Sequence, residues 1–201
     1  QGLESANVGL YWRYEKWIRS NESSLFSTTG ATGALYAIRR CDYQPLPADA
    51  LLDDFDTPIS LLREGKRTVF EPSAKAFDQA EAESSGEFRR KSRTLAGNFQ
   101  SFRRHSWLFY PSKNPVWWQF LSHKVFRLMV PYAMLVALLA SLSGDTVFLN
   151  IMLFAQVVFY SLGLLGLLGL ENRLVSVIKV FLQLNAAAVV GAWRALRGGS
   201  N

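Results

Sequence analysis

Apolar residues are concentrated in the last third of the chain, where three long runs cover residues 125–142, 147–170 and 175–193. A helix of about nineteen residues is roughly 28 Å long at 1.5 Å per residue, close to the ~30 Å core of a bilayer. The pattern therefore predicts three transmembrane helices within residues 125–201. The residues before these runs are more polar and predict a part of the chain that lies outside the bilayer core.

The front half, residues 1–86, alternates between helical and extended patterns. Residues 9–19 carry an aromatic stripe at helical spacing, and a second helix is expected from about Asp53. Residues 34–38 and 66–77 hold short apolar runs bounded by Gly and Pro, which is typical of strands. Helices alternating with strands predict a cytoplasmic α/β domain, seen here only in part.

Three aspartates mark the start of the helix expected near residue 53. Asp53, Asp54 and Asp56 suit a helix N-terminus, where free backbone N–H groups favour negative charge. Gly65 is suited to the C-terminal cap. Asp54 and Asp56 also form an Asp-x-Asp pattern, but a metal motif of that kind is expected to end a strand rather than open a helix.

Residues 87–104 predict a long amphipathic helix with one aromatic face and one basic face. The aromatic face carries Phe88, Leu95, Phe99 and Phe102, and the other carries Arg90, Arg93, Gly97 and Arg104. Such a helix lies in the membrane interface with its apolar face toward the lipid. Tryptophans, which are enriched at headgroup level, follow it and extend the predicted interface region to residues 87–124.

The net charge of +6 is concentrated ahead of the apolar runs, with nine Lys and Arg against Glu87 alone in residues 86–127. A basic block beside membrane spans favours anionic lipid or a phosphorylated ligand over nucleic acid. The positive-inside rule places the front half in the cytoplasm and the loop 143–146 outside. Three spans would put Arg194 and Arg197 outside, against the rule, so either the third segment is re-entrant or the chain continues.

Few residues suit disulfide or metal chemistry. Cys41 is the single cysteine, which excludes an internal disulfide and a Cys-rich metal site. His105 and His123 are too few and too far apart in the sequence for a histidine-based metal site. No metal ligands are therefore expected in this chain.

Three features in this order resemble the C-terminal portion of a membrane-embedded family 2 glycosyltransferase. They are LLDDFDTP at 51–58, RRKSRTLAG at 89–97, and an aromatic interface segment ahead of a cluster of spans. The family includes synthases of cellulose, chitin, hyaluronan and bacterial exopolysaccharides. The resemblance implies a partial GT-A domain, a Rossmann-like α/β fold, at residues 1–86. It also implies a UDP-sugar donor and a divalent metal, Mg²⁺ or Mn²⁺, whose ligands are expected before Gln1.

The resemblance also implies the catalytic residues. Leu52-Asp53-Asp54 resembles the Thr-Glu-Asp motif of the family, which makes Asp54 the general base and Asp53 its partner in the catalytic pair. A carboxylate in hydrogen-bond reach of an acceptor hydroxyl can take its proton as the hydroxyl attacks the sugar. Taken alone, an Asp pair at a helix start is more often a cap.

A second motif implies a site for the nucleotide diphosphate. Residues 90–94 with Gly97 resemble the family motif Gln-Arg-x-Arg-Trp-x-x-Gly, which assigns diphosphate binding to Arg93 and Arg90. Arg90 stands where Gln is usual, and Thr94 where Trp is usual. Cations at this point stabilise the leaving phosphates. Taken alone, a basic helix before a span is more often a topological signal.

A glycine-rich segment implies the acceptor side of the site. GATGALYAIRR at 30–40 resembles the family strand that leads toward the acceptor, so Gly30, Ala31, Thr32 and Gly33 are assigned there together with Thr94.

The expected function is transfer of a sugar from a nucleotide-sugar to a polysaccharide or lipid-linked acceptor. The expected location is a bacterial-type inner (plasma) membrane, with several spans and the catalytic part in the cytoplasm. Without the donor-binding half, residues 1–201 alone are expected to be inactive. Two alternatives stay open: a non-processive transferase acting on a polyprenyl-phosphate carrier, and a non-catalytic module that anchors or docks partners on anionic lipid.

Overall fold

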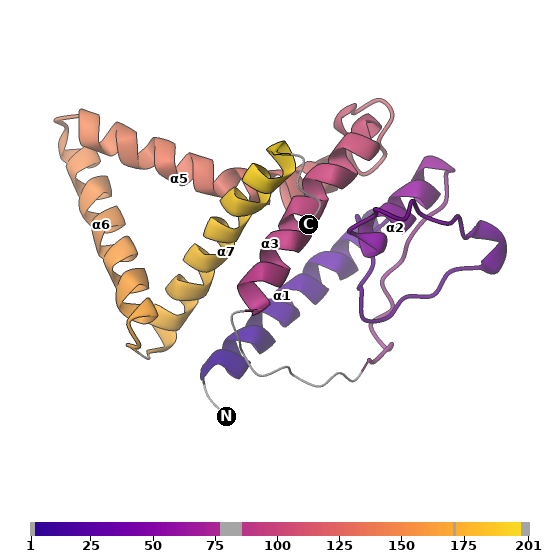
Figure 1. Ribbon diagram of the computed structural model, residues 1–201, viewed down its shortest axis with the longest axis horizontal. Coiled ribbons are helices and arrows are strands. Elements are labelled where there is room, and N and C mark those ends of the chain that lie inside the picture. Colours follow the sequence, from indigo (N-terminus) through magenta and orange to yellow (C-terminus); the bar gives the residue numbers. More distant parts are fainter. Residues whose placement is uncertain (1–2, 77–85, 171, 198–201) are drawn as a thin grey trace.

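The computed structural model describes the backbone of residues 3–76, 86–170 and 172–197, and the side chains from residue 12 onward except for 77–91, 171 and 198–201. Within these ranges the regular elements are helices and no strand is present (Figure 1). They are α1 (Leu3–Leu25), α2 (Asp53–Arg63), α3 (Gly86–Arg104), α4 (Trp117–Phe120), α5 (Phe126–Ser143), α6 (Val147–Leu167) and α7 (Arg173–Leu196), with short turns η1 (Arg40–Asp42), η2 (Ser106–Phe109) and η3 (Leu121–Val125).

The predicted α/β fold, a partial GT-A domain, is therefore wrong, and the described part of the chain is all-α. Residues 34–38, expected as a buried strand, lie largely exposed and form no ladder. In the second expected strand the backbone of Thr68 bonds to Ser27 and Thr28, and the N–H of Phe70 donates to the hydroxyl of Ser23. A strand requires a run of backbone partners on a neighbouring strand, which neither segment has in the described residues.

The helix expected near residue 53 is confirmed as α2, with three aspartates in its first turn. Gly65 ends it with a positive φ of 78°. The N–H of Gly65 donates to the carbonyl of Leu62, and the N–H of Lys66 donates to that of Leu61. This is the left-handed cap for which glycine is the favoured residue.

Helix α3, predicted as an amphipathic interface helix, lies between two other parts of the protein. A Cβ on Gly97 would come 2.7 Å from Cγ of Leu52, just ahead of α2. A Cβ on Gly191 of α7 would come 2.9 Å from the backbone nitrogen of Ala96. Both glycines thus allow close approach, and α3 joins α2 to α7.

A buried apolar core joins the front half to the start of the membrane segment. Its buried members are Leu52, Phe55, Ile59, Leu62, Leu108, Val116 and Phe120. The ring of Phe102 on α3 contacts Phe55 and Phe120 edge to face at 6.1 and 5.1 Å. Because Phe120 lies near the start of a continuous helical segment from Trp117 to Ser143, this core fixes the first apolar helix to α2 and α3.

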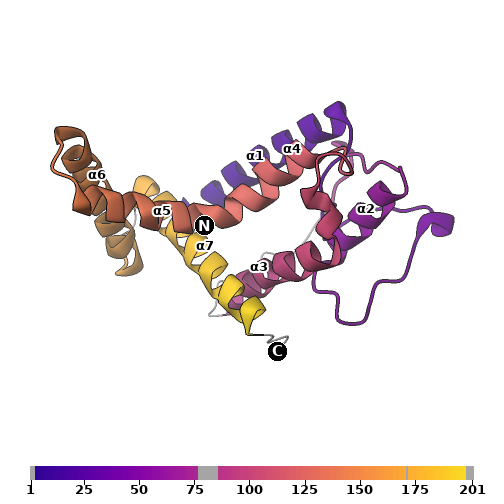
Figure 2. The same ribbon diagram turned by 90° about the horizontal axis from the view of Figure 1, so that it is seen from above.

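Three helices are long and apolar enough to cross a membrane: Trp117–Ser143, α6 and α7. Their positions agree with the three runs predicted from the sequence, and they are consistent with a multi-pass membrane protein. In Figure 1 the last three helices form the sides of a triangle. In Figure 2, α1 runs beside α4 and the helical segment that continues from it.

The contact between α3 and α7 gives a first prediction. Gly191→Leu should lower the free energy of unfolding by about 1–3 kcal/mol, because its side chain would meet the backbone of α3. Thermal unfolding in detergent measures the change. Ala186→Leu, on an exposed position of the same helix, is the matched control. Equal stability of the two variants would contradict the close packing.

Candidate functional site

The candidate site lies where the loop 27–33 meets the first turn of α2. A helix carbonyl normally accepts the N–H four residues later, but residue 58 is proline and has none. The carbonyl of Asp54 accepts instead from the N–H of Ala31, at 2.7 Å. Pro58, which lies inside α2, therefore gives the loop its attachment to the helix.

The glycines of this loop allow its backbone to approach Asp54 closely. A Cβ on Gly33 would lie 3.2 Å from Oδ2 of Asp54. A Cβ on Gly30 would lie 3.4 Å from the carbonyl of Asp54 and 3.7 Å from Nζ of Lys124. The structure thus brings the assigned acceptor-side residues Gly30, Ala31 and Gly33 to the assigned general base.

The charge environment of Asp54 combines burial with two nearby cations. Burial, assisted by the neighbouring charge of Asp53, raises the pKa of the Asp54 carboxyl above its usual value. Lys124 and Arg19 act in the opposite direction. Nζ of Lys124 lies 5.3 Å from the centre of the Phe55 ring, so this cation lies against an aromatic face and next to Gly30 of the loop.

The other two aspartates of α2 are engaged elsewhere. Asp53 is exposed and accepts a hydrogen bond from the hydroxyl of Tyr36 at 3.4 Å. Asp56 is fully buried, 2.6 Å from Nη1 of Arg104 and 3.4 Å from Nε2 of His105. Burial acts to raise the pKa of Asp56, but these partners lower it below its usual value. Asp56 is therefore a structural link between α2 and α3.

A buried cluster of charged residues on α1 and η3 holds the loop 27–33 in place. His123 lies between two carboxylates of α1, with Nδ1 2.9 Å from Glu22 and Nε2 3.4 Å from Glu15. Arg19 lies 3.2 Å from Glu15 and donates hydrogen bonds to the carbonyl of Gly30 and the hydroxyl of Thr32. Thr32, the remaining member of the assigned acceptor loop, is thus held by α1.

Glu22 connects the loop with the membrane segment. Its carboxylate accepts the N–H of Thr29 at 3.2 Å and also faces His123. His123 and Lys124 belong to η3, a single π-helical turn at the start of the first apolar helix. Such turns are frequent at functional sites because they redirect side chains within a helix.

Sequence reasoning missed this cluster. The periodicity of α1 predicts a helix, which is confirmed, but its aromatic stripe does not form the buried face. Tyr14 and Trp17 are exposed, whereas Glu15 and Glu22 are buried. The available signal was the run Glu15, Arg19, Glu22, whose spacing of four and three places opposite charges on one side of a helix.

The described residues record no contact between the assigned diphosphate residue Arg93 and the aspartates of α2. Arg93 is exposed on α3, and no hydrogen bond or ion pair joins it to Asp53 or Asp54 there. Thr94, which was assigned to the acceptor side, is exposed next to it. The side chain of Arg90 lies outside the described residues.

The described part of the chain contains no set of ligands for the divalent metal that the resemblance implies. There, no group of three or more His, Cys, Asp and Glu residues is arranged to hold a metal ion. The described residues do not fit a metal, and the chemistry assigned to Asp54 is that of a carboxylate.

The buried cluster predicts a pH dependence of stability. Burial acts to raise the pKa of Glu15, but the hydrogen bond and charge of His123, with Arg19, lower it from 4.5 to about 2. A carboxyl whose pKa is depressed on folding stabilises the fold above its unfolded pKa, and this contribution is lost as pH falls through the folded pKa.

Between pH 4.5 and about 2, the wild type should therefore lose stability relative to Glu15→Gln, by on the order of 3 kcal/mol. Denaturation in detergent at stepped pH measures this difference. Glu64→Gln, at an exposed position of the segment after α2, is the control. A constant difference between wild type and Glu15→Gln across this range would contradict the pairing.

In comparisons with known proteins, no protein-family model, no curated protein and no solved structure matches this chain.

Proposed function

We propose that this chain carries the general base and the membrane segment of a glycosyltransferase. The enzyme would move a sugar from a nucleotide-sugar to a polysaccharide or lipid-linked acceptor at the membrane surface. The observation that carries the proposal is the position of Asp54. Its carboxylate is half-buried, faces a glycine-containing loop and lies beside Lys124 at the start of an apolar helix.

Asp54 differs from its neighbours in being available for chemistry. Asp53 accepts a hydrogen bond from Tyr36, and Asp56 is paired with Arg104. Within the described residues no ion pair or side-chain hydrogen bond engages the carboxylate of Asp54. A general base needs free lone pairs directed at the substrate, and a pKa moved toward the working pH increases its efficiency. Burial supplies that shift.

The reaction follows from these roles. The acceptor hydroxyl gives its proton to Asp54 while its oxygen forms a bond to the anomeric carbon of the sugar. The bond from that carbon to the diphosphate oxygen breaks, and the nucleotide diphosphate leaves with the electron pair. Lys124 stabilises the carboxylate form of Asp54 before the proton arrives. Gly30 and Gly33 let the backbone of the loop approach Asp54 closely, which fixes the position of the carboxylate.

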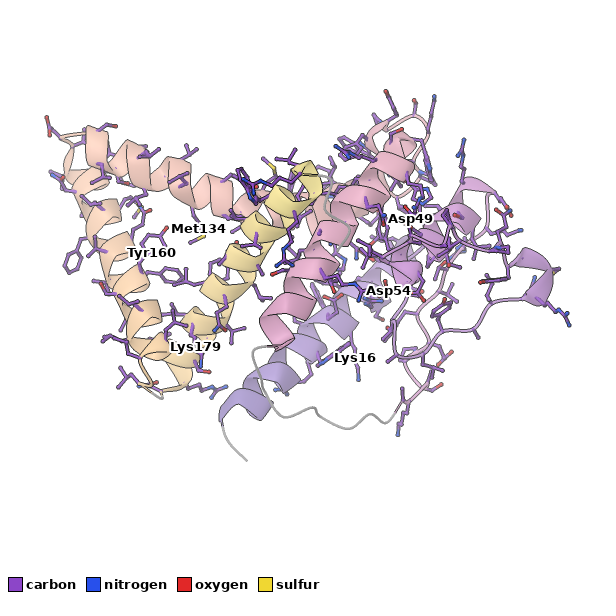
Figure 3. All side chains as sticks on the ribbon, in the orientation of Figure 1. Lys16, Asp49, Asp54, Met134, Tyr160 and Lys179 are labelled. Atoms are coloured by element: carbon purple, nitrogen blue, oxygen red, sulfur yellow. The ribbon has the colours of Figure 1, made fainter. Side chains whose placement is uncertain are left out.

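The position of the site supports an acceptor that is delivered at the membrane. Lys124 and His123 belong to the π turn ahead of α5, and the charge of Lys124 acts on Asp54. Figure 3 shows Asp54 to the right of α3, with the triangle of apolar helices on the left. A lipid-linked or growing polymer acceptor would reach such a site along the membrane surface.

Substitution of Asp54 tests the proposal. In membranes that contain the complete protein encoded by the gene, Asp54→Asn should reduce sugar transfer from a UDP-sugar by about 10²- to 10⁴-fold, because the base is lost while the side-chain shape is kept. Radiolabel incorporated into lipid-linked or polymeric product measures the transfer. Asp145→Asn, in the exposed loop between α5 and α6, is the control.

Unchanged transfer by Asp54→Asn, with normal transfer by the control, would contradict a catalytic role for this carboxylate. A chain that only anchors or docks partners on anionic lipid would show membrane association, and no transfer, in either variant. The length of the labelled product separates a processive synthase from a transferase that adds one sugar to a polyprenyl-phosphate carrier.

A further inference from the structure

The last three helices meet at three corners, and this arrangement bears on how they sit in a membrane. Helices α5 and α6 meet at one corner, where Nε2 of Gln156 donates to Oγ of Ser141 at 3.1 Å. Helices α6 and α7 meet at a second, where a Cβ on Gly166 would come 2.8 Å from Val175. The third corner joins the end of α7 to the start of α5 beside the front half (Figure 1).

The third corner lies on the side of the membrane where α5 begins. Gly191, near the end of α7, lies against the backbone of α3. Helix α3 is tied to the front half by the contact of Gly97 with Leu52. Its Phe102 contacts Phe120, which precedes α5 in the same helical segment. The end of α7 and the start of α5 are therefore both fixed to the front half.

Three consecutive spans are incompatible with an arrangement in which the end of α7 and the start of α5 lie on the same side of the membrane. If α5 crosses away from the front half and α6 crosses back, α7 begins on the front side. A third crossing would carry its end about 30 Å away, the thickness of the bilayer core. The contact of Gly191 with α3 instead returns that end to the front side.

Charge supports the same topology. Arg173 opens α7, and Arg194 and Arg197 close it. The loop between α5 and α6 contains Asp145 and no Lys or Arg. With both ends of α7 on the front side, every one of these arginines obeys the positive-inside rule. The conflict that three spans create for Arg194 and Arg197 then disappears.

Helix α7 is partly covered by its neighbours and partly exposed. Its exposed large apolar side chains are Leu174, Val177 and Phe181 in the first half and Val189, Trp193 and Leu196 in the second half. Ile178 is buried where α7 packs on α6, and Ala188 and Ala192 are buried near the contact of Gly191 with α3. A helix lying in the interface likewise has one part covered by protein and exposed apolar side chains available to lipid. Helix α6, by contrast, exposes apolar side chains around its circumference.

We propose that only α5 and α6 cross the membrane, as a helical hairpin, and that α7 lies along the membrane surface on the front side. The exposed apolar side chains of α7 enter the acyl region, and the arginines at its two ends meet lipid phosphates. This inference does not depend on the proposed function.

The arrangement also places an apolar groove of about 250 Å³ between the hairpin and α7. Met134 of α5 and Tyr160 of α6 point into this space from two sides (Figure 3), and Asn185 lines it from α7. With α7 in the plane of the membrane, the groove lies in the leaflet on the front side, where it is filled by lipid chains.

Side-specific labelling of single cysteines tests the topology. In the complete protein with Cys41→Ser, cysteines are introduced one at a time at exposed positions: Ser112→Cys for the turn ahead of α4 on the front side, Asp145→Cys for the hairpin loop, and Asn172→Cys and Arg197→Cys for the two ends of α7. A membrane-impermeant maleimide is applied to intact cells and to inverted vesicles. Leu196→Cys, also exposed, repeats the measurement at the second end in case the Arg197 variant does not fold.

We expect Asn172→Cys and Arg197→Cys to label from the same side as Ser112→Cys, and Asp145→Cys to label from the opposite side. Labelling of Arg197→Cys, or of Leu196→Cys, from the side of Asp145→Cys would show that α7 crosses the membrane and would overturn the proposal. Labelling of Asp145→Cys from the side of Ser112→Cys would overturn it as well, because α5 and α6 would then not form a spanning hairpin.

Discussion

The pairing of buried charges at the edge of the membrane segment determines how the rest of the protein is arranged. Glu15 and Glu22 are buried on α1, a placement that is costly unless each carboxylate has a partner. His123 lies within reach of both, from the π turn that continues into α5. The same Glu22 holds the N–H of Thr29, so one cluster positions α1, the loop beside Asp54 and the first apolar helix.

The local pattern of the sequence was enough to predict most helices but not this cluster. The spacing of apolar residues indicated α1, α3 and the three apolar helices, and the aspartates indicated the start of α2. The cluster joins residues 101 positions apart, and no window of sequence shows that Glu22 faces His123. Pattern reading also favours burial of aromatic residues, whereas here Trp17 is exposed and Glu15 is buried.

The error in fold class has a similar origin. A short apolar run bounded by Gly and Pro is typical of a strand, but whether it becomes one depends on distant backbone partners. Thr68 finds only Ser27 and Thr28 in the described residues, and these serve to hold the loop. The site itself was predictable in part: Asp54 and the glycines near it meet, while the attachment of Ala31 to the carbonyl released by Pro58 required the structure.

The measurement that tests this account most directly is a double-mutant cycle between Glu22 and His123. Unfolding free energies of the wild type, Glu22→Gln, His123→Gln and the double variant would be measured in detergent at neutral pH. The account predicts a coupling energy of at least about 1 kcal/mol, because either single change removes the shortest polar contact of a buried partner, the 2.9 Å contact between Nδ1 of His123 and Glu22. Effects that add to within about 0.3 kcal/mol would contradict it, since the two residues would then be energetically independent.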